Sequence, residues 1–115
     1  MTRTEDALKT AIDALEEKKG EQIKVIDISK ISVMADYFVI ASGKNLNQIK
    51  AMADEVEEKL SKEGIEPRQI EGANSSGWIL MDYRDFIIHI FNEDMRLYYD
   101  IERIWSDGIP VDINK

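Results

Sequence analysis

Three side chains in this sequence have the chemistry for acid–base catalysis. Asp82, Asp85 and the only histidine of the chain, His89, lie in the stretch GWILMDYRDFIIHIF at 77–91. Two carboxylates held close together push their pKa values apart, and a nearby histidine can carry a proton. Whether they act together depends on how this stretch folds.

The alternation of residues predicts two strands joined by a two-residue turn at Tyr83 and Arg84. In that register position 82 pairs with 85, 80 with 87 and 78 with 89. One face is purely apolar, belongs in the core, and carries Ile79, Met81, Phe86, Ile88 and Ile90. The other face is mixed and carries Trp78, Leu80, Asp82, Asp85, Ile87, His89 and Phe91.

This register argues against catalysis. His89 lies two to three residue pairs from the acids, roughly 10–14 Å at ~3.4 Å per residue, and Trp78 faces it instead. Aspartates beside a turn commonly make local hydrogen bonds, and an aromatic–histidine pair across two strands is a plain structural contact. We therefore predict no catalytic residues and a protein that is not an enzyme.

Other reaction classes have weaker support. Ser42-Gly43 lacks the second glycine of a nucleophile elbow, and SGKN at 42–45 lacks the glycine-rich lead and the ending of a phosphate loop. An anion could still bind at the helix N-terminus after Gly43. With one histidine, no cysteine and no ligand spacing, the sequence predicts no metal and no cofactor.

Composition limits the partners and the location. The 115 residues carry a net charge of -8, which repels a phosphate backbone and suits a basic protein partner better. We therefore expect little or no direct nucleic-acid binding. Taken alone, the charge is explained more simply by solubility. The N-terminal segment has no apolar signal region, and no run approaches the ~20 residues of a membrane span. We expect a cytoplasmic protein with no membrane contact.

The helices and strands around the hairpin are predicted from hydrophobic periodicity and from residues that start or end helices. The predicted order is a helix from Thr2 to Gly20, strands at 22–28 and 37–41, a helix from Asn45 to Gly64, a weak edge strand at 65–71, the hairpin, and a helix from Asn92 through Trp105. The run at 37–41, YFVIA, is typical of a central strand. The fold class is α/β (α+β), a single domain over 1–115 with a mixed five-stranded sheet covered by helices, ordered over 3–107, with a frayed tail at 108–115.

The aromatic residues favour an interaction surface. Most of the large ones lie in the C-terminal third, at Trp78, Tyr83, Tyr98, Tyr99 and Trp105. Tryptophan and tyrosine dominate interface hot spots, although core packing explains residues on a helix's apolar stripe equally well. Trp78 is the strongest interface candidate, because its face also carries acids.

Five segments in one order resemble a known family. DYFVIASG at 36–43, ADEVEEKL at 53–60, EG at 71–72, the hairpin at 77–91 and RLYYDIERIW at 96–105 resemble the ribosomal silencing factor family (RsfS, Iojap) over roughly residues 4–107. The resemblance implies a homodimeric, non-enzymatic regulator with a nucleotidyltransferase-like topology. It implies binding to the large ribosomal subunit through its basic protein L-fourteen, which blocks joining of the small subunit and represses translation under nutrient limitation. Organelle relatives act in large-subunit assembly.

The family's hairpin pattern matches Trp78, Asp82, Asp85, His89 and Phe91, whereas Arg84 stands where the family usually has glycine. The predicted partner-binding residues are Glu71, Trp78, Asp82, Tyr83 and His89, with the acids meeting lysine or arginine at the rim. The alternatives are a nucleotidyltransferase-like nucleotide-binding protein and a large-subunit assembly factor.

Overall fold

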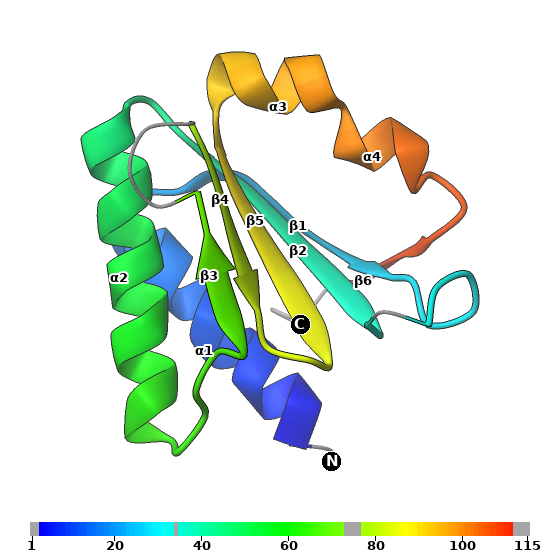
Figure 1. The fold of residues 1–115 in the computed structure, drawn as a ribbon, viewed down its shortest axis with the longest axis horizontal. Helices are drawn as coiled ribbons and strands as arrows, with labels where there is room; N and C mark the ends of the chain where they lie inside the picture. Colours follow the sequence, from blue (N-terminus) through cyan, green and yellow to red (C-terminus); the bar gives the residue numbers. More distant parts are fainter. Residues whose placement is uncertain (1–2, 34, 73–76, 112–115) are drawn as a thin grey trace.

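The computed structural model describes residues 3–33, 35–72 and 77–111, which form one mixed sheet with helices on both faces (Figure 1). The elements are α1 (Arg3–Glu17), β1 (Glu21–Asp27), β2 (Tyr37–Gly43), α2 (Leu46–Lys62), β3 (Gln69–Glu71), β4 (Trp78–Asp82), β5 (Phe86–Asn92), α3 (Glu93–Tyr99), α4 (Ile101–Ile104) and β6 (Ile109–Val111). The strand order is β3-β4-β5-β2-β1-β6. β2 and β5 pair in parallel, and the other neighbours pair antiparallel. The predicted mixed sheet is confirmed, with six strands instead of five.

The two central strands are buried on both faces. In β5 the six residues from Phe86 to Phe91 are buried, and in β2 those from Phe38 to Gly43. Strands covered on both faces read as continuous apolar runs rather than alternating ones, which is why YFVIA predicted a central strand correctly.

The helices cover the two faces unequally. α1 and α2 pack on one face, where α1 lies behind the sheet in Figure 1, whereas the short α3 and α4 extend from the end of β5 over part of the other face. α1 and α2 bury apolar stripes at helical spacing, made by Ala7, Leu8, Ala11, Ile12, Ala14 and Leu15 in α1 and by Ile49, Met52, Ala53, Val56 and Leu60 in α2. Leu46 was predicted in the second stripe and is exposed instead.

The predicted helix starts are confirmed where the structure describes them. Asn45 Oδ1 accepts from the backbone N–H of Gln48 at 2.8 Å, and Asn92 Oδ1 accepts from that of Met95 at 2.8 Å. Thr2 and the loop residues 73–76 lie outside the described residues. The Gln48 side chain does more than close the cap, because its Nε2 also donates to the carbonyls of Lys18 and Lys19 at the end of α1.

The C-terminal segment corrects two predictions. The helix expected from Asn92 through Trp105 is broken at Asp100, whose φ of 49° ends α3 and starts α4. The tail expected to fray contains β6, which pairs with Val25, Ile26 and Asp27 of β1. The prediction treated Pro110 as a residue that ends regular structure. Proline is tolerated in an edge strand such as β6, because one side of an edge strand's backbone needs no hydrogen-bond partner.

The hairpin register is shifted by two residues from the prediction. Trp78 pairs with Phe91, Leu80 with His89 and Asp82 with Ile87. The turn moves by one residue, to Arg84 and Asp85, and the Tyr83 N–H closes it by donating to the Phe86 carbonyl at 2.9 Å. Arg84 adopts a φ of 74°, a conformation that costs a non-glycine residue about 1 kcal/mol or more. The predicted assignment of hairpin residues to the two faces is still correct, because a shift of two residues keeps every side chain on the same face of the sheet.

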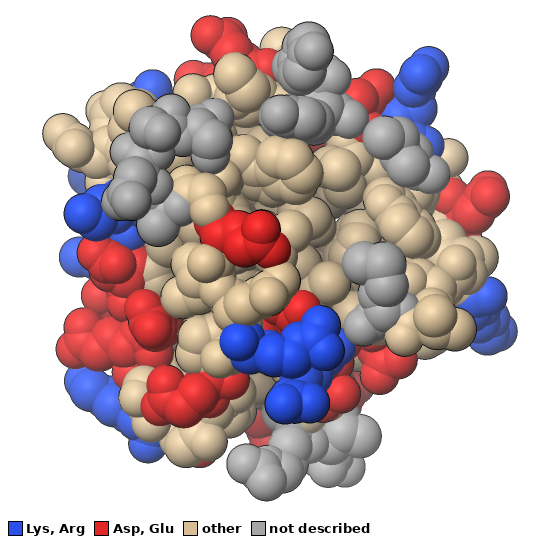
Figure 2. Space-filling view, in the orientation of Figure 1, with Lys and Arg blue, Asp and Glu red and all other residues tan. Residues whose placement is uncertain are grey.

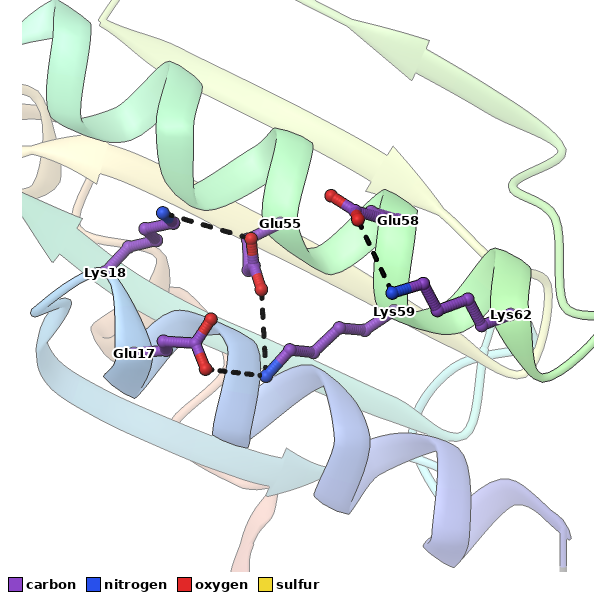
Figure 3. Close-up of polar contacts among 6 residues, drawn as sticks. All are labelled: Glu17, Lys18, Glu55, Glu58, Lys59 and Lys62. Atoms are coloured by element: carbon purple, nitrogen blue, oxygen red, sulfur yellow. Dashed lines mark hydrogen bonds and ion pairs between the residues drawn. The ribbon is translucent and has the colours of Figure 1, made fainter.

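Alternating charges join the two long helices (Figure 3). Lys59 Nζ on α2 contacts Glu17 Oε1 on α1 at 3.0 Å and Glu55 Oε2 at 3.7 Å, while Lys18 of the α1 end reaches Glu55 at 3.9 Å. A hydrogen bond with Glu55, and next the Lys59 ammonium, lower the pKa of Glu17, whereas the same hydrogen bond raises the pKa of Glu55. Lys59 therefore holds two carboxyl groups together across the helix pair.

We expect Lys59→Met to lower the free energy of unfolding, because it leaves Glu17 and Glu55 without their shared cation. Lys62→Met is the matched control, since Lys62 pairs with Glu58 on its own helix at 3.5 Å. Urea unfolding at low salt should show the larger loss for Lys59→Met, and the difference should shrink at high salt. Equal losses in the two variants would contradict the cross-helix role.

Candidate functional site

The sheet face opposite α1 and α2, here called the open face, is built around aromatic residues. Its buried cluster comprises Ile26, Ile28, Ala35, Phe38, Ile40, Ile87 and Phe91. Half-buried Trp78, Leu80, Met95, Ile101 and Trp105 pack around it. Figure 2 shows this side of the molecule, where uncharged residues fill most of the centre and charged ones gather along the α2 edge. The face thus offers apolar surface that α3 and α4 leave partly open.

His89 lies at the centre of this aromatic cluster and is 4% exposed. Its Nδ1 accepts a hydrogen bond from Trp78 Nε1 at 3.2 Å, so the ring is neutral at that nitrogen and carries its proton on Nε2. The Phe38 ring meets it edge-on at 4.7 Å, and the Trp78 and Phe91 rings stack beside it at 5.9 and 6.1 Å. His89 Nε2 has no hydrogen-bond partner among the described residues.

Burial also sets the protonation of His89. Loss of solvation lowers its pKa to about 4, because a charged imidazolium is disfavoured among aromatic rings. At neutral pH the side chain is therefore uncharged. It works as the acceptor that fixes the Trp78 indole on the open face, and not as a proton donor.

Asp82 lies on the same face, at the turn end of β4, and is occupied within the chain. Its Oδ2 accepts from Arg68 Nη2 at 2.5 Å, and its Oδ1 accepts from the backbone N–H of Arg84 at 2.8 Å. The side chain is 6% exposed. These bonds tie the start of β3 to β4 and hold the strained Arg84 in the turn. The structure thus gives Asp82 a partner of its own rather than a free carboxylate at a rim.

The remaining predicted residues are divided between the two faces. Glu71 of β3 is exposed and pairs across the strands with Leu80, so it lies on the open face beside Trp78. Tyr83 packs on the opposite face, 5% exposed, with its ring stacked on Phe86 at 5.2 Å. Burial raises the pKa of the Tyr83 hydroxyl. The structure therefore brings together Glu71, Trp78 and His89, and separates Tyr83 from them.

The predicted set of partner-binding residues left out Leu80, Phe38 and Trp105, although Trp105 was among the aromatic candidates. Leu80 separates Glu71 from His89, whereas Phe38 on β2 contacts both His89 and, at 5.1 Å, Trp105. The alternation placed Leu80 on the mixed face, which was the available signal. Phe38 and Trp105 come from distant segments, and only the sheet order and the path of α4 bring them to this site. The side chains of Tyr98 and Tyr99 are outside what the structure describes.

The three residues with acid–base chemistry do not converge. Asp85 is exposed at the turn and its Oδ2 accepts from Thr4 Oγ1 at 3.3 Å, while Asp82 is bound to Arg68 and His89 to Trp78. Within residues 3–33, 35–72 and 77–111, no group of three or more histidine, aspartate or glutamate side chains could hold a metal ion, and no helix could span a membrane. Each of the three side chains is thus bound to a different partner.

Comparison with known proteins agrees with the motifs. A family model described as "Ribosomal silencing factor during starvation" matches residues 1–115. A protein named ribosomal silencing factor RsfS, from Halalkalibacterium halodurans, is 34% identical over 109 residues, which cover 95% of this chain and 93% of its own length. The chain belongs to the ribosomal silencing factor family. The predicted resemblance is thereby confirmed.

A solved structure shares the fold of this chain. The crystal structure of a Chromobacterium violaceum protein aligns with a TM-score of 0.88 at 35% identity, covering 91% of this chain and 88% of that one. A mouse relative named mitochondrial assembly of ribosomal large subunit protein 1 is 28% identical over 83% of this chain and 43% of its own length. The α+β fold is thus shared with the Chromobacterium violaceum protein. The likeness to nucleotidyltransferases stays a prediction.

We expect this protein to lose stability as the pH falls below about 6.5. The pKa of His89 is about 6.5 in the unfolded chain and about 4 in the folded one. Between these pH values the unfolded state binds more protons, so a falling pH favours unfolding. Each unit by which the pKa is lowered corresponds to about 1.36 kcal/mol, so the free energy of unfolding falls by about 3 kcal/mol in total.

Urea unfolding at several pH values measures this dependence. His89→Asn is the matched variant, since it keeps an acceptor for Trp78 but does not titrate in this range. Its stability should fall less than that of the wild type between pH 6.5 and 4. An identical pH dependence would show that His89 is not the group responsible.

Proposed function

We propose that this protein is a ribosomal silencing factor that binds the large ribosomal subunit through its open face and blocks joining of the small subunit. The observation that carries the proposal is the half-buried Trp78, fixed by His89 and flanked by Leu80 and the exposed Glu71. The family to which the chain belongs is named for silencing ribosomes during starvation, which supports a partner of this kind.

The physical case rests on a fixed indole. A partner that covers Trp78 gains a large contact area at little entropic cost, because the Nε1–His89 bond already holds the ring. Leu80 extends the apolar contact toward β3. Rigid aromatic anchors of this type commonly carry most of the affinity of an interface.

The charge of the surface supports a basic partner. Glu71 projects from β3 beside the apolar contact, and the chain carries a net charge of -8. Complementary charge accelerates encounter and suppresses wrong partners. The basic large-subunit protein L-fourteen is the partner we propose. Asp82 and His89 support this surface from within, and Tyr83 supports it from the core side of the hairpin.

The proposed mechanism is steric. A compact domain seated on the joining face of the large subunit excludes the small subunit without any covalent step. We further propose a cytoplasmic homodimer that represses translation when nutrients are limiting. The mouse relative's name gives specific support to a second role in large-subunit assembly, which would show as accumulated subunit precursors in cells lacking the protein.

A nucleotide-binding protein is the alternative from the enzyme class. Calorimetric titration with magnesium nucleotides separates the two functions, since micromolar binding would favour the alternative.

We expect Trp78→Ala to weaken binding to isolated large subunits by tenfold or more while the domain stays folded. Loss of a hot-spot tryptophan costs about 2 kcal/mol or more. The measurement is co-sedimentation with separated subunits, with circular dichroism to check folding. Leu46→Ala is the matched control, an exposed apolar residue at the start of α2. Wild-type affinity in Trp78→Ala would remove the open face from the interface.

We expect Glu71→Lys to slow association with the large subunit and to flatten its dependence on salt, because an exposed charge acts mainly on the encounter rate. Stopped-flow binding at several salt concentrations measures both. Glu58→Lys, on the exposed side of α2, is the control. A salt dependence that is unchanged in Glu71→Lys and altered in Glu58→Lys would place the docking surface on α2 instead.

A further inference from the structure

Two exposed arginines lie beside the turn of the β4–β5 hairpin, at the end of β4 away from Trp78. Arg68 comes directly before β3, and its backbone N–H donates to the Asp82 carbonyl at 2.6 Å, whereas Arg84 lies in the turn itself. Figure 2 shows basic side chains at the lower centre of the open face, over the turn end of the hairpin in Figure 1. The contacts of Asp82 identify this basic spot as Arg68 and Arg84, here called the turn arginines.

The buried carboxylate of Asp82 fixes both turn arginines. Its Oδ2 accepts from Arg68 Nη2 at 2.5 Å, and its Oδ1 accepts from the backbone N–H of Arg84 at 2.8 Å. The Arg68 side chain stays 53% exposed in this pair. One carboxylate is therefore paired with one guanidinium, and the charge of Arg84 is not part of that pair.

Arg84 combines an unfavourable backbone conformation with an unused side chain. Its φ of 74° lies in the region that favours glycine. The residue is exposed, and within residues 3–33, 35–72 and 77–111 its guanidinium makes no hydrogen bond or ion pair; only its backbone N–H is bound. A strained position whose side chain serves no contact inside the fold indicates a contact outside it.

The acids around the turn decide which anion suits Arg84. Asp85 and Asp36 are both exposed, and the Asp85 carbonyl accepts from the Asp36 backbone N–H at 2.8 Å. The Asp85 carboxylate accepts from Thr4 of α1, which places it toward the helix side of the sheet. A nucleic-acid strand would bring several phosphates within the screening length of about 8 Å of these acids. A single carboxylate brings one charge, so an acidic side chain of a protein is favoured over a phosphate backbone.

The open face carries the opposite charge farther along β3. Gln69 and Glu71 are exposed on β3, where Gln69 Nε2 donates to Glu71 Oε2 at 2.8 Å. They pair across the strands with Asp82 and Leu80. Arg84 therefore follows Leu80, the partner of Glu71, by four residues, roughly 10–14 Å at ~3.4 Å per residue. A partner on this face meets a negative group at one point and a positive group at another.

We propose that Arg84, held in place by Asp82 and Arg68, binds an aspartate or glutamate side chain of the protein on which the open face docks. This inference rests on the proposed function and adds the orientation of the partner to it. The planar guanidinium takes a carboxylate through two parallel N–H···O bonds. With a basic group opposite Glu71 and an acidic group opposite Arg84, only one orientation avoids like charges at both points.

Arg84→Gly tests the proposal, because a contact with a partner and a role within the fold predict different results. Glycine accepts the positive φ, so the urea midpoint should equal or exceed that of the wild type. Co-sedimentation should show binding to isolated large subunits weakened by about fivefold or more, because a charge-assisted contact is lost. Arg84→Lys keeps the charge without the fork and should recover only part of the affinity. Wild-type affinity in Arg84→Gly would overturn the proposal.

A control variant separates the contact from a general effect of charge. Lys30→Gly removes an exposed positive charge from the turn after β1 and should leave the affinity unchanged. Equal weakening by Lys30→Gly and Arg84→Gly would overturn the proposal, since the loss would then follow net charge alone.

Two purified probes separate a protein carboxylate from an RNA phosphate. The probes are the large-subunit protein L-fourteen and large-subunit RNA freed of protein. We expect the weakening by Arg84→Gly with the purified protein. A weakening seen only with the RNA would assign Arg84 to phosphate and overturn the proposal.

The same assays distinguish failure of this inference from failure of the proposed function. If the wild type does not sediment with large subunits, the proposed function fails and this inference fails with it. If the wild type binds and Trp78→Ala weakens binding while Arg84→Gly does not, only the role of Arg84 is overturned.

Discussion

The parallel pairing of β2 with β5 is the constraint on which the rest of the structure depends. Seven consecutive residue pairs, from Tyr37–Phe86 to Gly43–Asn92, place apolar side chains on both faces of the sheet at once. Neither face can then be left to water, because each carries isoleucine, valine or phenylalanine from both strands. The two long helices complete one face, and the two short helices, α3 and α4, complete only part of the other.

This unequal cover leaves exposed the surface that we propose for partners. On the α1–α2 side the core is closed and the helix pair is fastened by Lys59. On the open face the side chains that would otherwise be exposed are aromatic, and they shield one another through Trp78, His89, Phe38 and Trp105. Aromatic contacts of this type contribute about 0.5–1.5 kcal/mol beyond the area they bury. Stability of the sheet and presentation of the indole therefore come from the same contacts.

The polar residues of the hairpin fit this arrangement as supports. Asp82 offsets the unfavourable φ of Arg84 by accepting its N–H, and it holds β3 through Arg68. His89 holds the Trp78 indole in place by accepting its N–H at 3.2 Å. The histidine and aspartate of the family's hairpin pattern thus support neighbouring side chains and do not form a reactive group.

Period-two and helical spacing predicted most of the elements and the two faces of the hairpin, because both patterns tolerate small errors in register. They were enough to predict which hairpin residues enter the core, the caps at Asn45 and Asn92, the central position of YFVIA and the family. The remaining features depend on contacts that the sequence pattern does not show. Asp82 accepts the backbone N–H of Arg84 in the turn, the sheet order brings Phe38 to His89, and pairing with β1 makes residues 109–111 into β6. Each of these depends on a contact between segments far apart or on one backbone angle, and no local pattern of residues encodes either.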